Sequence, residues 1–287
     1  MTSSSRHPLG RPSAWLIGLA LVACLSVPDL RAAVGMNADT DYATRGSIPG
    51  SGDAARLCDG GFKNTFQGVW VYRPSATATY ALSAGADFIN GISGAREIQL
   101  GFNSAGSTLA DLDLTVTFNS GGGAGATQSF ASHAGDDFLD TWVYYFILDN
   151  STSGQIAGYV TYADKGSTIT ESITRANDNA TSQFINTLYF GNRGGGSGIL
   201  GYYAYGRARF ATGITTSDVL TWSDLSTTAS GDWGFWPLDI DTDSADDSGN
   251  GRDLTFGGTM TTQTSPTLGG GGAPSGAPRL LLTGVGE

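Results

Sequence analysis

The chain of 287 residues is long enough for one large β domain or for two small ones. Glycine makes up 43 residues and aromatic residues 10%, a combination that favours many turns joined by strands over a disordered chain. The net charge of −11 argues against nucleic acid and anionic membrane surfaces as partners, because phosphate recognition requires concentrated positive charge. With only two Cys and two His, the chain is also poorly supplied for zinc sites and Ser-His-Asp triads.

The N-terminal segment has the layout of a secretory signal peptide, which we assign to residues 1–33. Two arginines precede an apolar run at residues 14–27, which is too short to span a bilayer and be retained there. Two processing routes stay open: ordinary cleavage at Ala32-Ala33, or acylation of Cys24 in the lipobox-like sequence LVAC of residues 21–24. We therefore expect a secreted protein or a surface-anchored lipoprotein, with no transmembrane span in the mature chain.

After a lead-in at residues 34–59, strand-like runs alternate with clusters of Gly, Ser, Asn and Asp. The predicted strands are 66–72, 76–82, 97–102, 112–119, 141–148, 155–163, 168–175, 187–190 and 200–210. This spacing predicts an all-β fold, an antiparallel β-sandwich or jelly roll. One short helix is expected near 216–225, where Asp218 favours the N-terminal end of the helix. Residues 261–287 are rich in Gly and Pro and are predicted to form a flexible tail.

Several of these segments occur in a familiar order. A strand that begins at a Trp, WVYYFILDN, is followed by QIAGYVTYAD, then by TLYFG, a Gly-rich loop and the expected helix. This succession resembles the laminin-G-like domains of the concanavalin A-like lectin/glucanase superfamily, and the resemblance implies one β-sandwich over residues 60–260. The segment WPLDIDTDSADDSGNGRDL at 236–254 is similar to an edge of that sandwich, although the family often carries it near the N-terminus. It either closes the same sandwich or begins a truncated second one; we favour closure, because residues 259–287 cannot build another core.

The acidic loop in this segment is a candidate cation site. Asp239, Asp241, Asp243 and Asp247 place several oxygen donors on a short loop, as Ca²⁺ requires. The alternative is a polar turn whose Asp and Asn side chains bond to their own backbone. Calcium is therefore the one cofactor that the sequence suggests, and the polar turn is the interpretation that we favour.

The aromatic residues near the Gly-rich loop are candidates for sugar stacking. Strict alternation would place Tyr203, Tyr205, Arg207 and Arg209 on one face of a strand, with Trp233 near the closing strand. This gives Tyr203, Tyr205, Arg207 and Trp233 as the predicted ligand contacts. The alternative is that these side chains pack in the core or at its rim, as Trp and Tyr usually do in a sandwich.

The scarcity of Glu argues against an enzyme. The chain contains Glu97, Glu171 and Glu287 alone, and no local pair of carboxylates of the kind that glycoside hydrolysis requires. We therefore expect a non-catalytic domain that binds a glycan or an extracellular protein. The alternatives are a structural or adhesive module of a cell-surface or virion assembly without a small ligand, and an atypical glycoside hydrolase.

Overall fold

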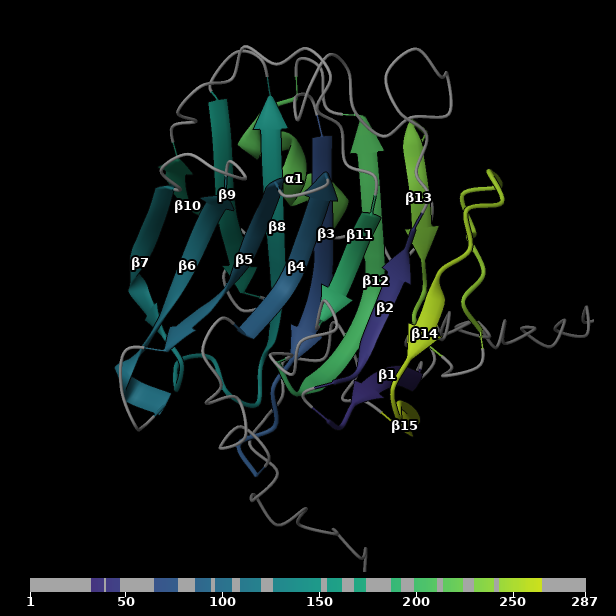
Figure 1. Cartoon of the computed structure of the whole chain (residues 1–287), viewed down its shortest axis with the longest axis horizontal. Coiled ribbons are helices and arrows are strands. Elements are labelled where there is room, and N and C mark those ends of the chain that lie inside the picture. Colours follow the sequence, from purple (N-terminus) through teal and green to yellow (C-terminus); the bar gives the residue numbers. More distant parts are fainter. Residues whose placement is uncertain are drawn as a thin grey trace, which may run out of the picture.

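Two antiparallel sheets face each other in the computed structural model (Figure 1). The structure describes residues 32–38, 40–46, 65–76, 86–93, 96–104, 109–119, 126–150, 154–161, 168–173, 187–191, 199–210, 214–223, 230–239 and 243–264. No helix in these ranges is long and apolar enough to cross a membrane. The fold is an antiparallel β-sandwich with one short α-helix, which confirms the predicted fold class.

The strands, one α-helix and one 3-10 turn follow one another along the chain. They are β1 (Ala32–Met36), β2 (Tyr42–Arg45), β3 (Thr65–Tyr72), β4 (Ala86–Ser93), β5 (Arg96–Ser104), a 3-10 turn (Leu109–Asp111), β6 (Leu112–Asn119), β7 (Ala126–Ala134), β8 (Trp142–Asn150), β9 (Gly154–Thr161), β10 (Ile169–Ile173), β11 (Thr187–Gly191), β12 (Gly201–Phe210), α1 (Thr216–Ser223), β13 (Asp232–Trp236), β14 (Thr255–Gly257) and β15 (Thr261–Thr264).

Sheet A has the order β10-β9-β8-β3-β12-β1-β15, with β13 also paired to β12, and sheet B has the order β14-β2-β11-β4-β5-β6-β7. The C-terminal strands β13, β14 and β15 pair with β12, β2 and β1 respectively. The strands β13, β14 and β15 therefore belong to the same two sheets as the strands that precede them. These pairings agree with closure of one sandwich, the alternative that we favoured, and the domain bounds stay a prediction.

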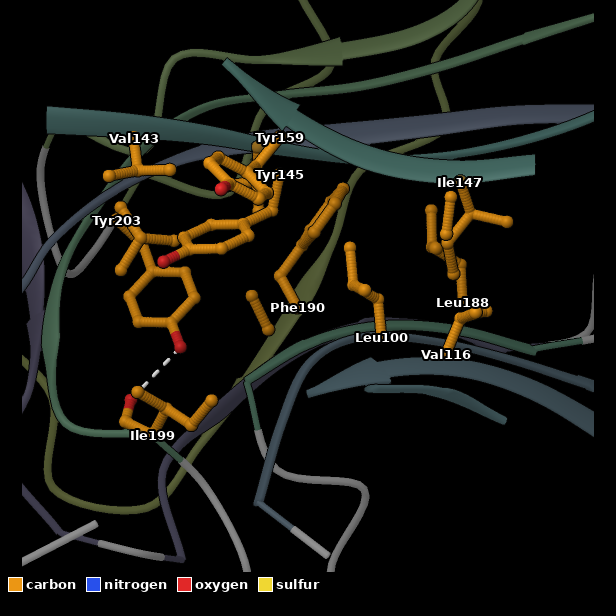
Figure 2. Packing of buried hydrophobic residues seen from close by; sticks show 14 of the residues in the cluster. Leu100, Val116, Val143, Tyr145, Ile147, Tyr159, Leu188, Phe190, Ile199 and Tyr203 are labelled. Carbon is orange, nitrogen blue, oxygen red and sulfur yellow. Dashed lines mark hydrogen bonds between the residues drawn. The ribbon is translucent and has the colours of Figure 1, made fainter. Parts of the chain in front are cut away.

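The main core lies between the two sheets and joins residues from both. Val69, Tyr145 and Tyr203 come from sheet A, whereas Leu100 and Phe190 come from sheet B, and all are buried. Figure 2 shows Tyr145 and Tyr203 meeting Leu100 and Phe190 in the space between the sheets. Burial of this apolar surface is the main stabilising contribution, because each fully buried large apolar side chain contributes about 1.5–3 kcal/mol.

The sequence patterns of β6 and β8 show which sheet faces are covered. In β6, the inward Leu114 and Val116 alternate with the exposed Asp113 and the partly exposed Thr117, as expected for a strand with one face in the core. In β8, WVYYFILDN is apolar almost without interruption, and residues 142–148 are all buried. Sheet A is therefore packed on both faces.

The outer face of sheet A carries a second cluster. Phe66, Trp70, Tyr144 and Phe146 belong to it, and Val219 of α1 packs into it. Figure 1 shows α1 behind sheet A, on the side where the arrow of β8 ends. The predicted helix near 216–225 is thus present as α1 and covers one part of this outer face.

Some predicted bounds differ from the structure. Strands β4 and β7 were not predicted, and residues 77–82 of the strand expected at 76–82 lie outside the described residues. The lead-in contains β2, β1 begins at Ala32 within the expected leader, and β15 lies within the expected tail. These terminal strands pair mainly with each other and with β11 and β12, so local sequence patterns give little sign of them.

Candidate functional site

The four residues predicted to contact a ligand lie in buried positions. Tyr203, Tyr205, Arg207 and Trp233 are exposed by 0%, 7%, 1% and 7%. The hydroxyl of Tyr203 donates to the carbonyl of Ile199 at 2.9 Å, as Figure 2 shows. The structure gives each of these side chains a packing role, and contact with a ligand stays a prediction for all four.

The prediction of strict alternation along β12 was wrong. Its pairing with β3 shifts register between Ala204 and Arg207, and Tyr205 has a φ of 51°. Tyr203 therefore packs in the core between the sheets, whereas Tyr205 packs in the outer cluster beside Ala204. The amide of Tyr205 donates to the carbonyl of Pro237 at 2.8 Å, which holds this bulge in place. A bulge inserts residues into one strand, and a period of two cannot reveal it.

Arg207 belongs to a buried ion group on the same strand. Its Nε lies 3.3 Å from Oδ1 of Asp232, and Nη1 of Arg209 lies 3.4 Å from the same oxygen. The guanidinium of Arg207 also lies over the ring of Phe235, 4.8 Å from its centroid. These contacts tie β12 to β13 and keep the charge of Arg207 paired inside the protein.

The acidic loop is organised by Asp246, a residue that was not among the predicted metal ligands. Oδ1 of Asp246 accepts from the amides of Phe235 and Ser248, both at 3.0 Å, and Oδ2 accepts from the amide of Arg252 at 3.0 Å. Gly249 and Gly251 have positive φ values of 81° and 67°, which the Ser-Gly-Asn-Gly sequence accommodates. This part of the loop is a polar turn bonded to its own backbone.

The predicted calcium ligands are spread over this loop. Asp239 is partly buried, Asp247 is exposed, and Oδ1 of Asp243 accepts from the amide of Ala245 at 3.0 Å. Asp241 lies outside the described residues, as does Cys24. Within the part of the chain that the structure describes, no three His, Cys, Asp or Glu side chains form a group able to hold a metal ion. Calcium binding and acylation of Cys24 stay predictions.

A row of three aromatic side chains crosses the outer face of sheet A. Tyr202 on β12 is directly opposite Tyr72 on β3, and Tyr72 is directly opposite Trp142 on β8. Ring centroids are 5.7 Å apart in both pairs, with interplanar angles of 5° for Tyr72–Tyr202 and 57° for Tyr72–Trp142. Tyr72 and Tyr202 are partly exposed, whereas Trp142 is 4% exposed. We call Tyr202, Tyr72 and Trp142 the aromatic row.

The aromatic row lies at the opposite end of β8 from α1. Trp142 is the first residue of β8, and Tyr72 is the last residue of the antiparallel strand β3. The helix covers the end where β8 finishes (Figure 1). The two partly exposed tyrosines therefore mark the part of the outer face that α1 leaves uncovered.

Asp140 places a carboxylate beside this row. Its Oδ1 accepts from the amide of Ser75 at 3.0 Å and from the hydroxyl of Tyr72 at 3.4 Å. The hydrogen bond from the Ser75 amide lowers the pKa of Asp140, and burial followed by the charge of Asp140 raises the pKa of Tyr72. At neutral pH, Asp140 is thus ionised and Tyr72 is a protonated donor. Asp140 is exposed, and neither of these bonds uses Oδ2.

The turn that carries Asp140 is held by Arg73, which is 2% exposed. Its Nη1 and Nη2 donate to the carbonyls of Gly135 and Asp137, both at 2.5 Å. The carbonyl of Arg73 accepts from the amide of Asp140 at 2.9 Å. Asp140 itself has a φ of 55°, in the left-handed region that Asp tolerates better than most residues. The buried guanidinium therefore stabilises a turn whose backbone is strained at Asp140.

Together these residues offer two kinds of contact. Aromatic rings pack against the apolar face of a sugar ring, and an ionised carboxylate accepts hydrogen bonds from its hydroxyls. The sequence did not predict Tyr72, Trp142 and Asp140 as site residues, because Tyr72 on β3 becomes a neighbour of Trp142 and of the turn before it only through the pairing of β3 with β8. A visible signal was the polar Asp at the end of a Gly-led loop directly before the Trp-initiated strand.

No family model and no curated protein matches the chain. Similar solved structures include a candidate carbohydrate binding protein from Bacteroides ovatus ATCC 8483, 15% identical, covering 82% of this chain and 61% of that one with a TM-score of 0.48. The native heptameric SAP-like pentraxin from Limulus polyphemus is 8% identical, covering 82% and 96% with a TM-score of 0.45. The LG1-3 region of the laminin alpha2 chain is 11% identical, covering 62% and 31% with a TM-score of 0.40.

This chain spans less than two thirds of the length of the Bacteroides ovatus protein and of the laminin region. Identities of 15% or less and TM-scores below 0.5 assign neither a function nor a binding residue to it. The fold therefore rests on the two sheets described above, and the site rests on the contacts of its own residues.

Proposed function

We propose that this chain is an exported, non-catalytic β-sandwich domain that binds a glycan through the aromatic row and Asp140. The observation that carries the proposal is the position of Tyr72, whose ring lies between Tyr202 and Trp142 while its hydroxyl donates to Asp140. This arrangement presents stacking surface and a hydrogen-bond acceptor at the same end of the sheet.

The rigidity of the site supports binding. Tyr72 and Trp142 are central-strand residues on neighbouring strands, and Asp140 is held through Arg73 and Ser75. A preorganised site binds with a smaller entropic cost than one that must be ordered by its ligand. Export of the domain, by either route that the N-terminal segment suggests, would bring this face into contact with extracellular polysaccharides.

The carboxylates near the row do not favour hydrolysis. Glycoside hydrolysis needs two carboxylates that converge on one bond. Asp140 supplies one, and its Oδ1 is already engaged by Ser75 and Tyr72. Oδ2 of Asp137, three residues earlier, accepts from the amide of Ala134 at 2.8 Å. We therefore place the domain among binding proteins.

A structural or adhesive module is the second candidate. It is favoured by the burial of Tyr203, Tyr205, Arg207 and Trp233, which gives the aromatic residues of the C-terminal half packing roles. A module of this kind would bind no small ligand and would retain no sugar at the aromatic row.

A glycan array, probed with and without EDTA, separates these candidates. We expect retention of a defined sugar class, followed by at least a tenfold loss of affinity in Tyr202→Ala and in Asp140→Asn, which is about 1.4 kcal/mol. Asp113→Asn on the exposed face of β6 is the matched control and should bind as the unmodified protein does. Absence of binding to every glycan on the array would favour the structural module, and release of free sugar would favour an enzyme.

A further inference from the structure

The outer face of sheet B carries a second pair of partly exposed tyrosines. Tyr42 on β2 and Tyr189 on β11 have ring centroids 5.9 Å apart at an interplanar angle of 67°. Their neighbours Ala43, Leu188 and Phe190 point into the core between the sheets, so both tyrosines point away from it. This pair therefore lies on the opposite side of the sandwich from the aromatic row.

Tyr42 stands between two glycines in the strand register. Gly191 is its partner on β11, and Gly257 is its partner on β14. The ring of Tyr42 lies against Gly257 so closely that a Cβ built on the glycine would collide with it, 2.6 Å from Cε1 and from the hydroxyl oxygen. One side of the ring thus packs on the backbone of β14, and the ring lies along the sheet surface.

The described strand partners of this pair are uncharged: Gly191 and Gly257 for Tyr42, and Thr44 and Asn90 for Tyr189. Thr44 is opposite both Tyr189 on β11 and Thr255 on β14. The hydroxyl of Thr44 donates to the carbonyl of Leu188 at 2.9 Å, while Thr255 is exposed. The charged residues next to this pair along the chain of β2 are Asp41, which is fully buried, and Arg45, whose Nη1 donates to the carbonyl of Asp253. A flat ring with neighbouring hydroxyls and no charged strand partner matches an uncharged sugar better than a charged ligand.

We propose that Tyr42, lying on Gly257 and flanked by Tyr189, is a second glycan-binding site specific for a neutral sugar. The two sites are on the outer faces of opposite sheets, and packed sheets are about 10 Å apart. One bound sugar ring cannot reach both faces. The domain would therefore link two polysaccharide chains, and its avidity for a polymer would exceed its affinity for a single fragment. The second site does not require the first, and each can fail alone.

The test compares soluble β-glucan, xylan and galactomannan, together with chitin oligosaccharides, as probes for the full chain. Isothermal titration with fragments of the retained polymer should give two sites per chain, and the long polymer should be precipitated. Tyr42→Ala should remove one site and abolish precipitation, whereas Tyr42→Phe should keep both. Gly257→Val, whose side chain displaces the ring, should behave like Tyr42→Ala. Thr127→Val, at an exposed position of β7 on the opposite edge of sheet B, is the control and should precipitate the polymer as the unmodified protein does.

Tryptophan fluorescence distinguishes the two sites, because Trp142 lies in the aromatic row and no tryptophan contacts Tyr42 among the ring pairs of the described residues. Loss of one site in Tyr42→Ala with the fluorescence change intact supports the inference. Unchanged stoichiometry and precipitation in Tyr42→Ala would overturn it and leave the first site standing. If Tyr202→Ala leaves binding intact while Tyr42→Ala abolishes it, the first site fails and the second stands. Absence of binding to every probe would overturn both.

Discussion

A hydrogen bond between Asp41 and Thr259 joins the turns that connect the first two and the last two described strands of the sandwich, although the two residues are 218 positions apart in the sequence. Oδ1 of Asp41 accepts from the amide of Thr259 at 2.6 Å, and Oδ2 accepts from the amides of Asn37 and Ala38 at 2.8 and 2.9 Å. Asp41 is fully buried, and a Cβ on Gly258 would collide with its carboxylate. The carboxylate therefore links the β1–β2 turn to the β14–β15 turn.

Replacement of Asp41 should destabilise the whole sandwich. Asp41→Ala leaves three backbone amides without their acceptor, and we expect a loss of about 3 kcal/mol in the free energy of unfolding. Urea unfolding measures this loss. Asp113→Ala, which removes an exposed Asp from β6, should change the free energy by less than about 0.5 kcal/mol. Equal stability of the two variants would show that the link contributes nothing to the fold.

This link also explains what local sequence patterns could not provide. The alternation in β6 and the apolar run in β8 predict their strands well. Alternating apolar and polar residues indicate that one face is buried, and a continuous apolar run indicates that both faces are buried. Strands β1, β2, β14 and β15 have three to five residues each and depend on partners from the other end of the chain. No local window contains that information.

The candidate site shows the same division between local and non-local information. The sequence indicated that aromatic residues matter and that the Ser-Gly-Asn-Gly segment forms a polar turn at the edge of the sandwich. The sequence pattern predicted Tyr203 and Tyr205 on one face of β12. This was wrong, because the bulge at Tyr205 changes which side chains of the strand share a face. The sequence also could not pair Tyr72 with Trp142 and Tyr202, since pairing of β3, β8 and β12 is a property of the assembled sheet.

His133 is an uncharged member of the core. Its Nδ1 donates to the carbonyl of Ala134 at 2.9 Å, so Nε2 accepts from the hydroxyl of Tyr145 at 2.8 Å. Burial, followed by the positive charge of Arg73, lowers the pKa of His133 from 6.5 to about 3. Between these two values the unfolded chain binds more protons than the folded one, so stability rises with pH and is lost as the pH falls.

We therefore expect the protein to lose about 2 kcal/mol of unfolding free energy between pH 7.5 and pH 5 through this one histidine. Urea unfolding at the two pH values of protein without the expected leader measures this loss, because His133 is then the sole histidine. His133→Gln should show no such dependence in this interval. The exposed Asp140 and Asp218, with pKa values below 3.8, do not titrate there. A flat profile in the unmodified protein would contradict the neutral, buried state of His133.

The acidic loop gives a prediction that separates its backbone role from metal binding. Asp246→Ala leaves the amides of Phe235, Ser248 and Arg252 unpaired and should cost about 3 kcal/mol. Asp243→Ala, which loses one exposed bond, should cost less than about 0.5 kcal/mol. Thermal unfolding in CaCl₂ and in EDTA completes the comparison. Stabilisation by calcium that disappears in Asp243→Ala would support the predicted cation site, and identical curves would count against it.

Arg73 is expected to act on binding as a positioning residue, through the turn that carries Asp140. In Arg73→Met, a side chain of comparable length keeps the packing against Phe102 but loses the bonds to Gly135 and Asp137. The unpaired carbonyls should lower the free energy of unfolding by about 3 kcal/mol. The loosened turn should reduce affinity for the sugar class found on the array about tenfold.

The comparison with Asp140→Asn distinguishes this indirect role from direct contact. Asp140 is exposed, so Asp140→Asn should weaken binding while unfolding changes by less than about 1 kcal/mol. Arg73→Met should weaken both, and in the double variant the two losses of affinity should not add, because both act through the same carboxylate. Additive losses would mean that Arg73 influences the ligand by a route other than the Asp140 turn. Affinity is followed by the fluorescence of Trp142, with Trp142→Phe as the control for the source of the signal.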